Sequence, residues 1–127
     1  MRMNLSDGEW KLMNRLWQDG PYTIMQLTEA LKSETGWSKH TVITMLARLE
    51  AKGAVRHEDG ERAKRYYPAV VREAISAAET ENFLSKVYNG RLGSMVNAMV
   101  DQKALSKQEI EELYEILKRA EESKFEK

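Results

Sequence analysis

Two helical patterns joined by a short turn stand directly before a strand–turn–strand pattern, and this order constrains the fold more than any other feature of the chain. The first helix is expected to begin at Thr23 and the second at Ser38, with residues 34–37 turning the chain between them. Gly53 is typical of a C-terminal cap for the second helix. The apolar residues of this helix recur at helical spacing and form one inner stripe: Val42, Met45, Leu46 and Leu49.

A further helix is expected before this pair, over residues 6–19. Ser6 and Glu9 have the spacing of a capping box at its start, and Gly20-Pro21 stops it. Its inner face is predicted at Trp10, Met13 and Trp17, widened by Leu12 and Leu16.

A β-hairpin is expected directly after the helical pair. Extended runs at residues 54–57 and 63–68 flank Asp59-Gly60, which is a turn signal between strands. Three helices followed by a hairpin is the order of a winged helix-turn-helix domain.

The second half of the chain carries only helical periodicity. Three short helices with narrow apolar stripes are expected there, and helices of this kind rarely build an adequate core alone. We therefore expect a mainly α protein, with an N-terminal winged helix-turn-helix domain and its small β-hairpin wing over residues 1–70, and a C-terminal helical dimerisation domain over residues 71–127. The residues predicted to make the dimer contact are Leu84, Val87, Leu92, Met95, Val96, Met99, Val100, Ile110, Leu113 and Leu117.

The composition excludes several classes of function. The 127 residues include no cysteine and only two histidines, His40 and His57, which argues against thiolate or multi-histidine metal sites and against a thiol nucleophile. There is no glycine-rich phosphate loop, and nothing suggests a Ser-His-Asp arrangement. No apolar run approaches a membrane span, and the N-terminus lacks the apolar stretch of a secretory signal. We expect a cytoplasmic protein that is not an enzyme, has no metal or cofactor and does not insert into a membrane.

Charge is distributed unevenly although the net charge is zero. Residues 1–70 carry 11 basic and 9 acidic side chains, whereas residues 71–127 carry 9 basic and 11 acidic ones. Within residues 38–65 there are seven basic and four acidic side chains. A positive surface is therefore expected on the second helix of the pair and on the hairpin, as contacts with nucleic-acid phosphates require.

The outward side of the helix that begins at Ser38 is a candidate reader of base edges. Thr44 can hydrogen-bond a base or touch a thymine methyl group, and Ile43 and Ala47 can make apolar contact with such methyl groups. Ser38 and Thr41, at the helix N-terminus, are candidates for binding phosphate. The alternative is an ordinary capped helix with a solvated face. The residues expected to face outward or sideways are Lys39, His40, Ile43, Thr44, Ala47 and Arg48.

The hairpin offers a second candidate contact. Arg62, Lys64 and Arg65 are placed to straddle the phosphates or the minor groove next to the helix. A solvated hairpin is the alternative, and the acidic residues around its turn argue mildly against deep contact with DNA.

Short motifs in both halves of the chain carry a family resemblance. They are Leu5-Ser6-Asp7-Gly8-Glu9-Trp10 with Met13 and Trp17, Trp37-Ser38, Thr41-Val42, Leu46-Ala47-Arg48-Leu49, Lys52-Gly53, Tyr66-Tyr67, Phe83-Leu84, Val87-Tyr88-Asn89-Gly90, Leu105-Ser106 and Glu109-Ile110-Glu111-Glu112-Leu113. Their order and spacing, from about residue 5 to residue 118, resemble the penicillinase-repressor family (BlaI/MecI/CopY type).

The resemblance implies a homodimeric transcriptional repressor that binds palindromic, double-stranded operator DNA in front of resistance or stress genes. It places operator contacts on the helix and on the wing. A winged-helix protein-interaction module is the alternative that the sequence leaves open. The positions that the resemblance assigns to the operator are Lys39, His40, Thr41, Thr44, Arg48, Arg62 and Lys64.

The resemblance also bears on regulation. Copper-responsive members carry a cysteine cluster, which this chain lacks, so copper sensing through thiolates is excluded. In β-lactam-responsive members an Asn-Phe bond in a dimerisation helix is cut, and the matching place here is Ala98-Met99, with Asn97 one position earlier. A membrane sensor protease is therefore a further candidate partner, and the residue types at the bond do not match the family pattern.

Overall fold

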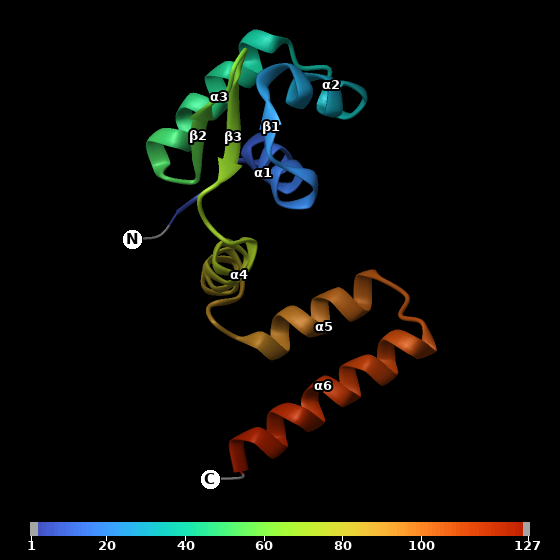
Figure 1. Cartoon of the computed structure of the whole chain (residues 1–127). Coiled ribbons are helices and arrows are strands. Elements are labelled where there is room, and N and C mark those ends of the chain that lie inside the picture. The colour runs from blue at the N-terminus through green and yellow to red at the C-terminus, as the bar shows by residue number, and fades with distance from the viewer. Residues whose placement is uncertain (1–2, 126–127) are drawn as a thin grey trace. The chain divides into compact units, whose positions relative to one another are not determined.

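The chain divides into two compact units, Met1–Asn82 and Phe83–Lys127. The structure is a computed structural model that describes residues 3–125 and the side chains of residues 3–123. The helices and strands, in chain order, are α1 (Asp7–Asp19), β1 (Tyr22–Thr23), α2 (Ile24–Thr35), α3 (Lys39–Lys52), β2 (Val55–Asp59), β3 (Lys64–Pro68), α4 (Arg72–Tyr88), α5 (Leu92–Gln102) and α6 (Lys107–Phe125) (Figure 1).

Helix starts follow the local signals in the sequence. Three helices begin with a reciprocal capping box. In each box the hydroxyl of the cap residue accepts the backbone N–H of the residue three positions later, and the side chain of that later residue accepts the backbone N–H of the cap residue. These boxes lie at Ser6 and Glu9 for α1, at Thr23 and Gln26 for α2, and at Ser106 and Glu109 for α6.

One apolar core holds the first unit together. It lies where α1, α2 and α3 meet the inner side of the sheet, and Ile75 of α4 completes it. The inner stripe predicted for α3 is confirmed, since all four of its residues are buried. The largest fully buried apolar side chains of the core are Leu12, Met13, Leu16, Leu27, Leu31, Val42, Leu46 and Leu49.

The two tryptophans of α1 lie at the rim of this core and not at its centre. Leu12, Met13 and Leu16 are buried, whereas Trp10 and Trp17 stay partly exposed with their ring centroids 5.9 Å apart. The indole N–H of Trp17 donates to the backbone carbonyl of Val70 over 2.9 Å. The buried face of α1 is therefore rotated slightly from the predicted one, toward Leu12 and Leu16. The reason is that a large ring with a polar N–H is rarely buried completely.

The sheet has three antiparallel strands in the order β1–β3–β2, with β3 in the middle (Figure 1). Tyr66 of β3 faces His57 of β2 on one side and Tyr22 of β1 on the other. The predicted hairpin is confirmed, and a turn closed by the Gly60 N–H on the Ala63 carbonyl over 3.0 Å connects its strands. β1 was not predicted, since two residues carry no alternation signal.

Helix, turn, helix and hairpin together make the winged helix-turn-helix that the element order predicted. α2 and α3 form the helical pair, and β2 with β3 forms the wing. The first unit continues into α4, so the division between units falls twelve residues after the expected boundary at residue 70. The expected domains also include residues 1, 2, 126 and 127, which lie outside the described residues.

The second unit consists of the end of α4 with α5 and α6. None of residues 83–123 is buried. Within the described part of the chain, no helix is long and apolar enough to span a lipid bilayer.

Candidate nucleic-acid interface

The helix α3 separates its residues cleanly into two sides. Its four inner apolar residues are buried, and Thr41 is half-buried. The opposite side is exposed along three turns, which is the arrangement that the spacing predicted. The exposed residues are Lys39, His40, Ile43, Thr44, Ala47 and Arg48.

Hydroxyl groups near the start of α3 are already engaged within the helix. Ser38 Oγ accepts the backbone N–H of Thr41 over 3.2 Å and lies 3.2 Å from Thr41 Oγ1. Thr44 Oγ1 donates to the carbonyl of His40 over 3.1 Å. The proton of Thr44 is thus used, and its oxygen lone pairs and its methyl group remain available to a base edge.

Exposed cations lie on the wing as well. Arg62 is in the turn, and Lys64 and Arg65 begin β3. Beside them is an open hollow of about 290 Å³ whose lining includes Arg62, Arg65 and Thr23 at the end of β1. The carboxylate of Glu61 also lines this hollow and offsets part of the positive charge of the two arginines.

Ion pairs remove two of the seven basic residues from the positive surface. Lys52 Nζ lies 2.6 Å from Glu9 Oε1, and Arg56 Nη1 lies 2.7 Å from Glu58 Oε2. The hydrogen bond from Arg56 holds the pKa of the exposed Glu58 carboxyl below its ordinary value. Among the residues that the structure describes, no ion pair is made by the other five: Lys39, Arg48, Arg62, Lys64 and Arg65.

One acidic neighbour of this surface, Glu50, is also engaged. Glu50 Oε2, near the end of α3, lies 2.6 Å from His57 Nδ1 on β2. The His57 ring is 5.6 Å from the Tyr66 ring, and Arg56 stacks 4.3 Å from the centroid of the Tyr67 ring. The Glu50–His57 contact joins the wing to the end of α3, whereas the two ring contacts lie within the wing, between β2 and β3.

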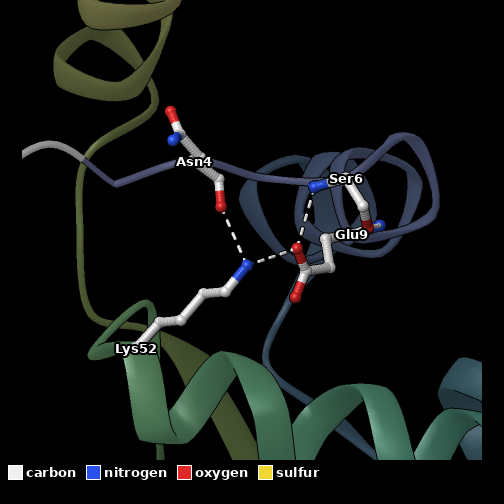
Figure 2. A network of polar contacts seen from close by, with 4 residues as sticks. All are labelled: Asn4, Ser6, Glu9 and Lys52. Carbon is white, nitrogen blue, oxygen red and sulfur yellow. Dashed lines mark hydrogen bonds and ion pairs between the residues drawn. The ribbon is translucent and has the colours of Figure 1, made fainter.

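Glu9 is a buried carboxylate that sequence reasoning missed. It is 2% exposed, and Lys52 Nζ donates both to its Oε1 and, over 2.8 Å, to the carbonyl of Asn4 (Figure 2). Burial raises the pKa of the Glu9 carboxyl, but the hydrogen bond and charge of Lys52 and the N–H of Ser6 outweigh it, so the pKa lies below its ordinary value of 4.5. The capping-box spacing revealed the bond to Ser6, but no local signal pointed to Lys52.

The residues expected to make a dimer contact all lie on α4, α5 and α6 of the second unit. None of them is buried; Leu84 and Met95 are half-buried and the other eight are exposed. Between α5 and α6 runs a mainly apolar groove of about 280 Å³, lined by Val96, Met99, Val100, Leu105 and Leu113 with three charged residues.

The candidate cleavage bond lies inside a helix. Ala98 is half-buried and Met99 is 56% exposed, and both belong to the middle of α5.

Comparison with known proteins identifies a family to which the sequence of this chain is similar. Residues 5–119 match the penicillinase repressor family. The chain belongs to that family. Its members are transcriptional repressors and not enzymes.

Individual relatives align over most of their length. The methicillin resistance regulatory protein MecI of Staphylococcus aureus is 33% identical over 113 residues, which are 89% of this chain and 92% of the relative. The penicillinase repressor of Bacillus licheniformis is 34% identical over 113 residues, 89% of this chain and 88% of the relative.

Solved structures of the family agree with the winged-helix fold. The DNA-binding domain of the repressor BlaI is 30% identical, with a TM-score of 0.51 over 57% of this chain and 90% of that one. The monomeric form of Bacillus licheniformis BlaI in complex with the blaP half-operator is 29% identical, with a TM-score of 0.51 over 57% and 89%. MarR of Staphylococcus aureus resembles 98% of the chain in fold alone, at 13% identity and a TM-score of 0.55 over 76% of its own length.

Proposed function

We propose that this member of the penicillinase repressor family is a homodimer that binds a palindromic operator, one winged helix on each half-site, and represses resistance or stress genes. The observation that carries the proposal is the exposed side of α3, which the rest of the first unit leaves uncovered. Five cations flank it, and none of them makes an ion pair with another described residue. The BlaI relative bound to a half-operator has the same fold over 57% of this chain, which supports the assignment of DNA as the partner.

The proposed contacts divide into two kinds. Thr44, Ile43 and Ala47 face the base edges in the major groove, where a hydroxyl oxygen and small apolar groups can discriminate between bases. Cations and the helix N-terminus contact phosphates and so position the helix without reading sequence. The residues proposed for phosphate contact are Ser38, Lys39, His40, Thr41, Arg48, Arg62, Lys64 and Arg65.

The second unit is proposed to hold two copies together. Its apolar side chains on α4, α5 and α6 are not covered within one chain, and an apolar surface of this kind favours association. Joining two winged helices makes the second half-site contact intramolecular, which raises avidity by about 10²–10⁴. Loss of the dimer would therefore release the operator.

Cleavage of the Ala98–Met99 bond is the proposed route of release, with a membrane sensor protease as the candidate partner. A cut there would divide α5 and separate its apolar residues. Because a protease needs locally extended backbone, α5 must open before the bond can be cut. The free energy of this local opening would then control the rate of induction.

Selection of bound duplexes from a random pool by the full chain tests the proposed function. We expect an inverted repeat whose half-sites lie about 10–10.5 base pairs apart, centre to centre, or a multiple of that spacing. Lys39→Glu should recover no repeat, because it reverses a charge at the start of α3. Lys11→Glu makes the same change on an exposed lysine of α1 and should recover the same repeat as the wild type.

The same experiment separates the two candidate functions. A protein-interaction module that uses the winged helix only as a scaffold would enrich no duplex at any salt concentration. Enrichment of single half-sites without a repeat would contradict the homodimer while leaving DNA binding in place.

A further inference from the structure

The ion pair between Glu9 and Lys52 joins the first turn of α1 to the last residue of α3 (Figure 2). These residues are 43 positions apart in the chain, and the pair has the short Nζ–Oε1 distance of 2.6 Å. The same ammonium group also holds the carbonyl of Asn4, over 2.8 Å. The ammonium group therefore donates one hydrogen bond to Glu9 in the first turn of α1 and one to the segment that leads into α1.

Lys52 leaves α3 on the side of its inner stripe, and its side chain is 37% exposed. It follows Met45 by seven residues, which is two helical turns, so the two side chains leave the helix in nearly the same direction. Met45 is buried against α1. This placement separates Lys52 from the five unpaired cations that we assign to phosphate contacts.

A second contact fixes the same two helices at a different height. A Cβ at Gly8, in the first turn of α1, would stand 2.9 Å from Met45 Cε and 3.2 Å from Trp37 Cζ2. The bare backbone of α1 therefore packs directly on α3 and on the turn before it. Gly8 limits how closely the helices approach, and the ion pair limits how far α3 can slide or tilt at its C-terminal end.

The pair is also costly to break. Glu9 is 2% exposed, and its second oxygen, Oε2, is buried without a hydrogen bond from the described residues. Any movement of α3 that withdrew Lys52 would leave a buried carboxylate without a counter-charge, which is strongly unfavourable. Separating such a pair costs more than the intact pair adds to stability, so arrangements that move Lys52 away from Glu9 are disfavoured.

We propose that Glu9 and Lys52 are positioning residues for operator recognition: their ion pair holds α3 at the one tilt that lets its exposed residues meet the base edges. The inference rests on the proposed function. Thr44 lies eight residues before Lys52, about 12 Å along the helix axis, so a tilt of about 5° displaces it by about 1 Å. A displacement of that size breaks a hydrogen bond to a base but leaves flexible lysine and arginine side chains within reach of phosphates.

Five variants of the full chain test this proposal, the fifth being Lys52→Arg. Glu9→Gln keeps the capping box, since glutamine serves at that position, but removes the charge that faces Lys52. Lys52→Met keeps the aliphatic stem and removes the ammonium group, and the double variant completes a mutant cycle. Lys11→Met is the matched control, because it removes one exposed lysine charge from α1.

Affinity is measured for two probes of equal length, the duplex recovered by selection and a scrambled duplex, at a temperature where circular dichroism shows every variant folded. We expect Glu9→Gln and Lys52→Met each to lower the ratio of the two affinities by about tenfold, and the double variant to lower it no further. Binding to the scrambled duplex should change little. Lys52→Arg, which keeps the charge and the donors, should restore most of the ratio, and Lys11→Met should leave it unchanged.

Other results would overturn the proposal. If Lys52 contacts a phosphate directly, Lys52→Met will weaken both probes equally and reduce the salt dependence, while Glu9→Gln will not weaken binding. If the pair only adds stability, both affinities and their ratio will equal those of the wild type at this temperature, because every variant is folded there. If the wild type binds neither probe selectively, the proposed function itself fails, and this inference falls with it.

Discussion

At the scale of single residues, the proposed interface separates side chains that read sequence from side chains that only hold phosphates. Thr44 lies in the middle of the exposed side of α3, and its hydroxyl proton is committed to the His40 carbonyl. Lys64 begins β3 on the wing and carries a charge without an ion pair within the described chain. The two residues should therefore affect DNA binding in different ways.

Thr44→Ala should lower the preference for the selected duplex over a scrambled one, because it removes an oxygen and a methyl group that meet a base. Lys64→Ala should weaken binding to both duplexes alike. It should also reduce by about 1 the slope of the logarithm of the binding constant against the logarithm of the salt concentration. Both are measured by fluorescence anisotropy over a series of salt concentrations. Thr28→Ala is the control for Thr44, since it removes the same bond, from a threonine hydroxyl to the carbonyl four residues earlier, in α2. Equal loss on both duplexes with Thr44→Ala would contradict a reading role.

At the scale of elements, the junction between α3 and the wing depends on one glycine. Gly53 has φ of 86°, and its N–H bonds the carbonyl of Glu50 over 3.0 Å. The next residue, Ala54, donates to the Leu49 carbonyl over 2.9 Å and directs the chain into β2. Because a Cβ at Gly53 would meet nothing within 4 Å, the requirement for glycine comes from the backbone conformation alone.

Gly53→Ala should lower the free energy of unfolding by about 1 kcal/mol, because an ordinary L-residue is disfavoured in the left-handed region. Gly53→Asn adds a larger side chain to the same open space, but asparagine tolerates that conformation, so its loss should be smaller. Urea unfolding followed by circular dichroism measures both. Equal losses for the two variants would show that space, and not backbone conformation, limits this position.

At the scale of the whole molecule, the two units differ in whether they bury their apolar side chains within one chain. The first unit buries its apolar stripes between helices and sheet. The second leaves apolar side chains uncovered along three helices, with Leu92 and Met99 each 56% exposed. A second copy of the chain is the cover that we propose.

Val96→Asp should make the protein monomeric and weaken binding to the full inverted repeat by about 10²-fold or more, because the link between the two winged helices is lost. Binding to a single half-site should be unchanged, since Val96 belongs to the second unit. Sedimentation equilibrium and gel shifts measure the two effects. Asn97→Asp adds the same charge one position along, outside the predicted apolar stripe, and should leave both unchanged. A monomeric variant that keeps full affinity for the repeat would refute the tethering of half-sites.

Capped helix starts and the end of α3 were predictable from the sequence because each depends on residues within four positions of one another. The end of α2 was not: the helix runs to Thr35, into the turn expected over residues 34–37. The Ser6–Glu9 box, the Gly53 cap and the inner and outer sides of α3 are all signals of this local kind. The exposed side of α3, and with it most of the candidate interface, followed directly from the same periodicity.

Tertiary structure alone decided which side chains meet across long separations. It placed Lys52 against Glu9, 43 residues away, and the Trp17 indole against the Val70 carbonyl, 53 residues away. It also paired Tyr22 with Tyr66 to add β1 to the sheet. Such contacts depend on the relative placement of whole elements, which no pattern of neighbouring residues encodes, so the sequence by itself determined the helices and the wing while the packing determined how the recognition helix is held.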